Sequence, residues 1–351
     1  MKLDLKPFYD LVDQKYISVQ KHDTADLLIW NYGPKCQYER YWTPETSMAR
    51  GLITDSQGNI IARPFRKFFN LGEHTGEDSK LPSLPVENFE VTNKLDGSLG
   101  ILYFMADKPY LATRGSFTSD QAIKGTEILH KKYSHIKFNP NYTYLFEILF
   151  KENRIVVDYK GLEDIILLAQ IYTESGEEVS PWDYSDVLTV VEKYDGITDI
   201  TKLTELAEDN KEGFVVKFKS GIRVKVKFEE YVRLHRLVTG VNARTIWDLL
   251  RNNQPFDELI NNVPDEYFDW VKKTKINLEK EFKQIEEKAI YGFNQVKDLP
   301  TRKEQALFLK EYSRYPGIVF KMLDKQPYGE LIWKMLRPAA SKPFHQDIDV
   351  L

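Results

Sequence analysis

Cysteine is nearly absent from the 351-residue chain, which contains only Cys36. A single thiol cannot form an internal disulfide, and it excludes zinc fingers and redox motifs that are built on cysteine pairs. The six histidines are scattered along the chain, and those at positions 130, 135 and 235 lack the spacing of metal ligands relative to one another. We therefore expect any metal chemistry to use oxygen ligands, which favours magnesium over zinc.

Long apolar runs are missing as well. The longest, such as Ile165–Ala169, fall far short of the roughly 20 residues that cross a bilayer. The first residues, Met1–Pro7, contain no apolar segment typical of a secretory signal. These absences predict a protein without membrane association in a reducing compartment, which is the cytoplasm or, for a viral protein, the host-cell cytoplasm.

The chain also has no GxxxxGK[ST] phosphate-binding loop, so phosphate binding must come from side chains. Its net charge of −4, from 49 basic and 53 acidic residues, argues against a nonspecific nucleic-acid coat protein. Positive charge is nevertheless concentrated in residues 214–236, with seven basic and two acidic residues, and in a second cluster of Arg63, Arg66 and Lys67. Both clusters are suited to phosphates, although a solvated strand face is the alternative for each.

Hydrophobic patterning divides the chain into two parts, in agreement with about two domains for this length. Up to about residue 238, short β-branched and aromatic runs alternate with turn residues. The expected strands cover residues 51–54, 60–63, 89–94, 100–105, 142–149, 155–159, 165–172 and 213–228, and a helix is expected over 120–133. This pattern predicts an α+β domain with antiparallel sheets over residues 1–241.

The rest of the chain, residues 242–351, has a helical pattern of apolar side chains with charged residues between them. Thr301 and Glu304 form a capping-box pattern that opens a helix, which Pro316-Gly317 is expected to close. The expected helices cover residues 268–289, 301–312 and 328–336. We predict an all-helical C-terminal domain.

The run Lys94-Leu95-Asp96-Gly97-Ser98 follows an apolar strand. A lysine at a strand end can face a cleft, and the glycine behind it lets a nucleotide approach the backbone closely. The alternative is a hairpin corner with a solvated lysine. Other motifs in the chain decide between the two.

A second hairpin is predicted within residues 213–228. A loop at 220–222 would place Lys217 opposite Lys225 and Lys219 opposite Arg223, with one apolar face and one cationic face. Like charges that face each other across strands are destabilising without an anion between them. The pattern therefore indicates a bound phosphate chain, and a lysine-rich solvent face is the alternative.

Seven short motifs stand in order along the chain: Arg50-Gly51, Lys67 with Phe69, Lys94–Ser98, Arg114-Gly115-Ser116, Phe146-Glu147-Ile148, Glu212–Val216 and Lys225-Val226-Lys227. The series resembles that of the covalent nucleotidyltransferases, and most closely that of the ATP-dependent RNA ligase 1 family of the phage T4 type. The likeness covers residues 30–231, and its particular marks are residues 63–70, residues 153–156 and Tyr231. It implies a nucleotidyltransferase (ATP-grasp-like ligase) domain followed by the helical domain.

The resemblance implies a role for each matching residue. Lys94 resembles the nucleophile that takes AMP from ATP, while Lys225 and Lys227 resemble catalytic phosphate clamps. Because an amine is a nucleophile only when it is neutral, we expect these two lysines to supply positive charge near Lys94. Glu212 resembles the residue that serves the divalent metal, and Glu147 resembles the one that binds the ribose.

Further residues resemble those that line the nucleotide pocket of the family. They are Arg50, Lys67, Phe69, Gly97, Arg114 and Tyr231. Phe69 and Tyr231 taken singly are also typical of core aromatic residues. Arg114 departs from the family, which often has lysine there, and it retains the charge but cannot act as a neutral amine.

The resemblance implies an ATP-dependent enzyme, with Mg²⁺ or Mn²⁺, that joins RNA 5′-phosphate and 3′-hydroxyl ends through lysyl-AMP and RNA-adenylate in RNA repair. Implied partners are RNA ends, including those of tRNA, and an end-healing kinase-phosphatase; we expect a monomer whose helical domain selects the RNA. One alternative is a DNA ligase or a GTP-dependent capping enzyme, against which the helical pattern over 256–336 argues, because those carry an OB domain there. The other is a non-catalytic RNA-binding protein, which has no need of a nucleophile.

Overall fold

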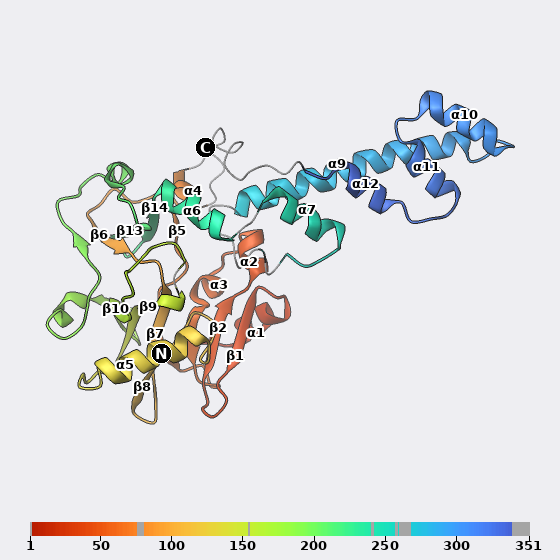
Figure 1. Cartoon of the computed structure of the whole chain (residues 1–351). Helices are drawn as coiled ribbons and strands as arrows, with labels where there is room; N and C mark the ends of the chain where they lie inside the picture. Colours follow the sequence, from red (N-terminus) through yellow and green to blue (C-terminus); the bar gives the residue numbers. More distant parts are fainter. Residues whose placement is uncertain are drawn as a thin grey trace. The chain divides into compact units, whose positions relative to one another are not determined.

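The computed structural model describes residues 2–75, 81–153, 155–239, 242–256, 259 and 268–338 (Figure 1). The chain forms two compact units that divide between Val238 and Thr239. Within the described residues the first unit is α+β, as predicted, and the second is helical. The boundary predicted after residue 241 falls on a residue outside the described ranges.

The first sheet lies near the N-terminus. Its strands are antiparallel, in the order β1 (Ile17–Lys21), β2 (Leu28–Tyr32), β3 (Arg50–Thr54) and β4 (Ile60–Ala62). The helices of this region are α1 (Lys6–Asp13), α2 (Pro34–Glu39) and α3 (Pro44–Met48). Helix α1 packs Phe8 and Leu11 in one cluster with the fully buried Trp30 of β2, so the sheet and helix share a core.

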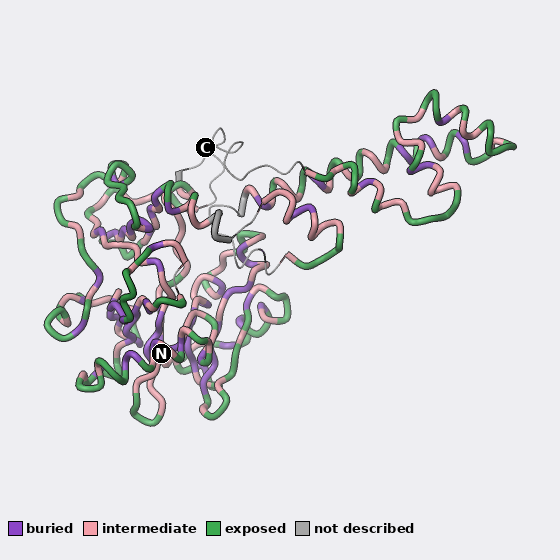
Figure 2. Tube along the Cα trace, in the orientation of Figure 1, coloured by how far each residue is buried: buried purple, intermediate pink, exposed green. Residues whose placement is uncertain are grey.

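The second sheet forms the centre of the unit. Its strand order is β11 (Glu178–Val179), β10 (Asp164–Tyr172), β9 (Tyr142–Leu149), β7 (Ser98–Met105) and β8 (Lys108–Ala112). Helix α5 (Asp120–Lys132) packs Ile128 against one face, whereas Ile101 of the other face packs with Ile29 and Ile53 of the first sheet. The central strands are therefore buried on both faces, as the purple trace in Figure 2 shows.

The third sheet carries the predicted chemistry. Its strand order is β12 (Lys193–Tyr194), β6 (Phe89–Lys94), β13 (Gly213–Phe218), β14 (Arg223–Lys227) and β5 (Phe69–Asn70). The short elements around it are α4 (Leu71–Thr75), η1 (Lys151–Asn153), η2 (Pro181–Tyr184), η3 (Ile200–Leu206) and α6 (Glu229–Thr239). The sequence predicts antiparallel sheets. In this sheet one pair departs from that prediction, because β5 runs parallel to β14.

Most predicted elements of the first unit are confirmed. Residues 89–94 and 142–149 are strands over their full predicted lengths, and α5 matches the predicted helix to within one residue. The strand predicted over 155–159 is wrong. Instead of joining a ladder, the backbone N–H groups of Val156 and Val157 both donate to Asp96 Oδ2 at 2.9 Å.

The β13–β14 hairpin has a different register from the predicted one. Lys217 lies opposite Arg223, and Val215 lies opposite Lys225. The predicted loop was one residue too far along the chain, because Phe218 N–H donates to the Ile222 carbonyl (2.8 Å) and leaves 219–221 at the tip. The residue opposite each position differs from the predicted one by two positions along the strand. Because side chains alternate between faces with a period of two, every side chain stays on its predicted face. The predicted apolar and cationic faces are therefore confirmed.

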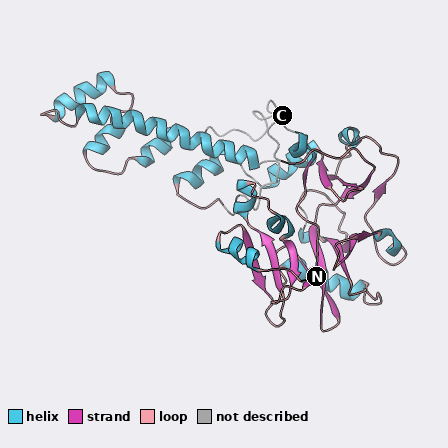
Figure 3. Ribbon diagram, turned by 180° about the vertical axis from the view of Figure 1, so that it is seen from behind, coloured by secondary structure: helices cyan, strands magenta, loops and turns pink. Residues whose placement is uncertain are grey.

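The second unit consists of helices within its described residues (Figure 3). They are α7 (Ala243–Arg251), α9 (Phe268–Val296), α10 (Arg302–Tyr312), α11 (Pro316–Leu323) and α12 (Gly329–Met335). The capping box of Thr301 and Glu304 is confirmed. Pro316 was expected to close the preceding helix, but it lies in the first turn of the next helix, α11. Its missing N–H loses no hydrogen bond there, because the first N–H groups of a helix have no partner within the helix. Among the described residues, no helix combines the length and apolar character that a membrane span requires.

Candidate active site

Lys94 lies at the end of β6, in a row that crosses three strands. It pairs with Gly213 of β13, and Gly213 pairs in turn with Lys227 of β14. Glu212 immediately precedes this row, and its Oε1 lies 2.7 Å from Nζ of Lys94 and 3.4 Å from Nζ of Lys227. The carboxylate is only 3% exposed, against 20% and 12% for the two lysines. One buried carboxylate oxygen therefore positions two ammonium groups.

Gly213 lets this arrangement form. Its φ of +146° is a conformation that residues with a side chain rarely adopt. A Cβ at this position would lie 2.0 Å from the Val226 carbonyl oxygen and 2.8 Å from Cα of Lys227. Any side chain here would push β14, and with it Lys227, away from Glu212.

Glu147 of β9 supports the turn that follows Lys94. Its Oε1 accepts a 2.9 Å hydrogen bond from the Gly97 N–H. A Cβ at Gly97 would lie 2.6 Å from the Ile148 carbonyl oxygen, so the close approach of turn and strand requires glycine. Burial of its carboxyl group raises the pKa of Glu147 to about 8; the positive charge of Lys94 opposes this rise, and the negative charge of Glu212 adds to it.

This pKa predicts how Glu147→Gln changes stability with pH. The folded-state pKa of about 8 exceeds the ordinary value of 4.5, so the folded protein holds the extra proton between these values. Stability then falls as the pH rises through this window. Because glutamine does not titrate, the melting temperature of the variant minus that of the wild type should rise by about 7 °C or more from pH 5 to pH 8, since the wild type loses about 3.5 kcal/mol of stability over this range. A difference that stays constant across these pH values would contradict the assignment.

Asp96 is a buried carboxylate to which the sequence analysis gave no role, although it lies within the lysine motif. It accepts hydrogen bonds from Val156 and Val157 and from the hydroxyl of Tyr231 at 2.7 Å. Its own N–H donates to the Tyr159 hydroxyl at 2.7 Å. Asp96 therefore fixes the turn beside Lys94 to two distant segments of the unit.

Tyr231 and the run 153–156 join this network. Tyr231, on α6, is buried in the core of the third sheet, and Nζ of Lys227 lies 5.5 Å from its ring centroid. Tyr231 is therefore both a core aromatic residue and a neighbour of Lys227, one of the predicted catalytic lysines. Asn153 donates to the Ile148 carbonyl and the Ser98 hydroxyl, each at 3.1 Å, whereas Arg154 lies outside the described residues.

Lys225 and Lys227 share one face of β14. Val224 and Val226 between them are buried on the other face, as strand alternation requires. Nζ of Lys225 lies 5.9 Å from the Phe68 ring centroid, and the guanidinium carbon of Arg50 lies 5.3 Å from the same ring. The ring therefore places Arg50, from β3, near the cationic face of the hairpin.

The remaining predicted pocket residues form an aromatic and cationic cluster. Nζ of Lys67 lies 5.2 Å from the ring centroids of Phe69 and Trp42 and 5.7 Å from that of Tyr32. The Arg114 guanidinium donates to the Tyr32 hydroxyl at 3.0 Å and lies 5.0 Å from its ring. Tyr32 and Trp42 were missed by the sequence analysis, because they belong to no motif that it identified.

Carboxylates that could bind a metal ion are few at this site. Across the described part of the chain, no three His, Cys, Asp or Glu side chains cluster as a metal site. Magnesium, however, is often held by one or two carboxylates together with substrate phosphates. Glu212, which contacts both Lys94 and Lys227, fits that mode.

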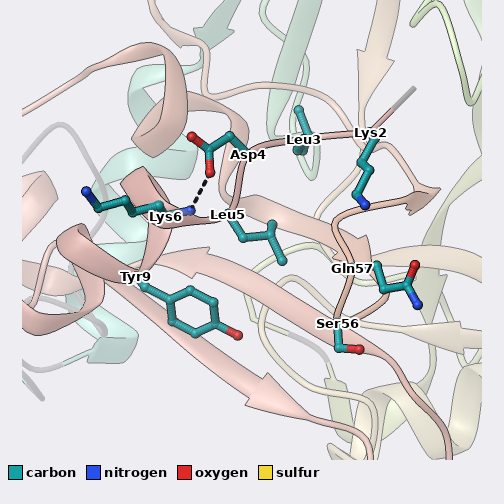
Figure 4. Close-up of a pocket in the computed structure, with 8 residues that line it drawn as sticks. All are labelled: Lys2, Leu3, Asp4, Leu5, Lys6, Tyr9, Ser56 and Gln57. Atoms are coloured by element: carbon teal, nitrogen blue, oxygen red, sulfur yellow. Dashed lines mark hydrogen bonds between the residues drawn. The ribbon is translucent and has the colours of Figure 1, made fainter.

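A separate surface pocket lies at the N-terminus and is drawn in Figure 4. Its lining residues are Lys2, Leu3, Asp4, Leu5, Lys6, Tyr9, Ser56 and Gln57. None of them belongs to the lysine centre or to the aromatic cluster. The pocket is therefore no part of the predicted active site.

The fold and the lysine centre define the class of the protein. A lysine at a strand end, held by a buried carboxylate beside a cationic strand, is the arrangement expected for an amine nucleophile with cations for a departing polyphosphate. This is the chemistry of a nucleotidyltransferase.

Residues 48–232 match the RNA ligase family of the T4 RNA ligase 1 type. The match spans more than half of the chain, which therefore belongs to this family and is an RNA ligase, an enzyme. It confirms the resemblance to the ATP-dependent RNA ligase 1 family, and it favours RNA ligase over the DNA ligase, capping enzyme and RNA-binding alternatives.

Individual relatives are distant. A Thermovibrio ammonificans protein with RNA ligase in its name is 25% identical over 279 residues, which cover 75% of this chain and 70% of the relative. An Autographa californica nuclear polyhedrosis virus protein with bifunctional polynucleotide kinase/RNA ligase in its name is 28% identical over 257 residues, 65% of this chain but 36% of that protein. An archaeal ATP-dependent RNA ligase structure is 14% identical with a TM-score of 0.46, covering 90% of this chain and 77% of its own.

Proposed function

We propose that this ligase joins RNA 5′-phosphate and 3′-hydroxyl ends through a lysyl-AMP intermediate on Lys94. The observation that carries the proposal is the contact of the Lys94 and Lys227 ammonium groups with the same oxygen of Glu212. This contact supports the proposal, because a nucleophile, a proton acceptor and a phosphate-binding cation would then lie within one centre.

The first step forms an N–P bond between Nζ of Lys94 and the α-phosphorus of ATP, and the bond to pyrophosphate breaks. A 5′-phosphate oxygen of RNA then attacks the same phosphorus and releases the lysine. Finally, the 3′-hydroxyl attacks the 5′-phosphate and AMP leaves. Each step transfers a phosphoryl centre, so positioning and charge stabilisation dominate catalysis.

The structure changes the expectation of how Lys94 becomes neutral. The sequence analysis placed only cations beside it, whereas Glu212 is its partner at 2.7 Å. At this distance the carboxylate can take the ammonium proton before the N–P bond forms, which leaves the lone pair of the neutral amine free to attack. Lys227, on the same oxygen, then stays beside the phosphates as their counter-charge.

A divalent metal ion, Mg²⁺ or Mn²⁺, would be held by Glu212 with the phosphates of ATP and would neutralise phosphate charge when bound. Glu147 accepts from Gly97 and would present its second oxygen to a ribose hydroxyl. Lys225, Arg50 and the aromatic and cationic cluster would bind the rest of the nucleotide.

The test is covalent labelling of the full chain. Incubation with ATP labelled at the α-phosphorus should give an acid-labile, protein-bound adduct, whereas ATP labelled at the γ-phosphorus and GTP should give none. A stoichiometric adduct would also exclude a non-catalytic RNA-binding protein. Absence of label from α-labelled ATP at saturating Mg²⁺ or Mn²⁺ would overturn the proposal.

For the second unit we propose a role in selecting the RNA. Among the described residues, its buried clusters around Trp247 and around Ala289 are made of residues of this unit, so it has a core of its own. The residues predicted to bind the nucleotide belong to the first unit. An added helical unit is suited to hold structured RNA by shape and phosphate contacts rather than by base readout.

Removal of the chain after Val241 tests this role. Because the first unit also has its own cores, the shortened protein should still form the adenylate. We expect it to join a nicked hairpin loop about tenfold more slowly than the full chain and a linear oligonucleotide at a nearly unchanged rate. Equal losses on both substrates, measured as ligation rates, would remove the specificity role.

We further propose cleaved tRNA as one substrate, a separate kinase-phosphatase that heals the ends, a monomeric state and a cytoplasmic location, in the host cell if the protein is viral. The name of the viral relative joins a polynucleotide kinase to an RNA ligase, which supports the kinase partner. Ligation of kinase-treated tRNA halves, compared with untreated halves, tests substrate and partner together.

A further inference from the structure

An ion-pair cluster outside the predicted site links the second sheet to the cationic hairpin. Glu178 of β11 forms a bidentate ion pair with Arg223 of β14 and lies 3.0 Å from Nζ of Lys217 on β13. Glu178 is 16% exposed and Arg223 is 10% exposed. Bidentate pairs of this kind fix geometry as well as charge.

This carboxylate supplies the anion that the sequence analysis assigned to a bound phosphate. Lys217 and Arg223 lie directly opposite each other, and such like charges are destabilising. Glu178 contacts both of them. Although burial alone would raise it, the hydrogen bonds and charges of Arg223 and Lys217 hold the pKa of Glu178 below its usual range.

The cluster continues toward the predicted phosphate-binding groups through aromatic rings. The guanidinium carbon of Arg223 lies 4.1 Å from the Phe65 ring centroid. Phe65 packs edge-on against Phe68, with 6.2 Å between the two ring centroids. Phe68 is the ring that Arg50 and Lys225 approach. A displacement of Arg223 would therefore be passed to both cations.

The alternate residues Arg223, Lys225 and Lys227 form one row on β14. Glu178 holds one end of this row and Glu212 holds the other. Lys225 lies between the two ends. A strand held by carboxylates at both ends cannot twist freely, so the lysines keep their distance from Lys94.

We propose that Glu178 is a positioning residue for adenylate formation: by neutralising Lys217 and Arg223 it holds the β14 row in the orientation that presents Lys225 and Lys227 to the phosphates of ATP. This inference rests on the proposed function and adds a residue remote from the nucleophile. Glu178 acts through Arg223 and the hairpin backbone, not by contact with substrate.

The test is the single-turnover rate constant of lysyl-adenylate formation at saturating ATP, measured per active site. We expect Glu178→Gln to lower it about tenfold, since a small misplacement of catalytic groups has effects of this size or larger. A purely structural role would reduce the labelled fraction but leave the rate constant unchanged. Glu330→Gln, which removes a more exposed Arg–Glu pair with Arg251 in the helical unit, should leave the rate constant within about twofold.

Two further variants make the outcome decisive. Glu178→Asp retains the charge, and its rate constant of adenylate formation should fall only about threefold. This variant keeps the test valid if Glu178→Gln folds poorly. Combining Glu178→Gln with Arg223→Met removes the repulsion from Lys217 and should restore most of the rate. A double variant as slow as Glu178→Gln would overturn the neutralisation argument.

The wild type, assayed in parallel, separates the two proposals. If the wild type forms the adduct and Glu178→Gln reacts at the same rate constant, the positioning role is wrong and the proposed function stands. If the wild type forms no adduct, the proposed function fails and this inference fails with it.

Discussion

The Lys94→Ala variant is expected to incorporate no label from α-labelled ATP. The methyl group has no lone pair to attack the phosphorus, and Lys227, which shares the Glu212 oxygen, lies farther from it than Lys94 does. The expected loss is complete within detection, and it is measured as protein-bound label after denaturation. Ligation of RNA that already carries a 5′-adenylate bypasses this step and should continue.

Lys94→Arg is the matched variant for charge. Guanidinium stays protonated and is a poor nucleophile, so this variant should also form no adduct while it retains the ion pair with Glu212. A labelled peptide that contains another lysine, recovered from either variant, would show that the nucleophile is misassigned.

Lys225→Ala and Lys227→Ala are each expected to lower the rate of adenylate formation by about a hundredfold or more. Loss of one preorganised charge that stabilises a transition state has effects on this scale. The two lysines share a face of β14, and Lys227 already shares an oxygen of Glu212 with Lys94. The measurement is the rate constant of label incorporation at saturating ATP.

Lys219→Ala is the control for this pair. Lys219 lies at the exposed tip of the same hairpin, outside the β14 row. We expect the rate constant of adenylate formation by Lys219→Ala to stay within about twofold of the wild-type value, because an exposed charge interacts weakly across solvent. Equal effects of all three substitutions would indicate general attraction of ATP to a basic surface instead of a defined phosphate site.

Much of the site was predictable because its elements are local. The strand over 89–94, the lysine at its end and the alternating lysines of 223–227 follow from short apolar patterns with period two. The order of the seven motifs then indicated the family, which the match over residues 48–232 confirms. These features depend on neighbouring residues and on composition, both of which a single sequence contains.

The sequence by itself thus determined the class of fold, the family, the nucleophile candidate and the apolar and cationic faces of the hairpin. Tertiary structure alone decided which groups meet: that Glu212 holds Lys94 and Lys227, that Asp96 binds the 156–157 backbone, and that Glu178 neutralises Arg223. Each of these contacts joins residues from different strands or loops. Their spacing along the chain carries no period, so only the packing of sheets and the burial of charge select the partner.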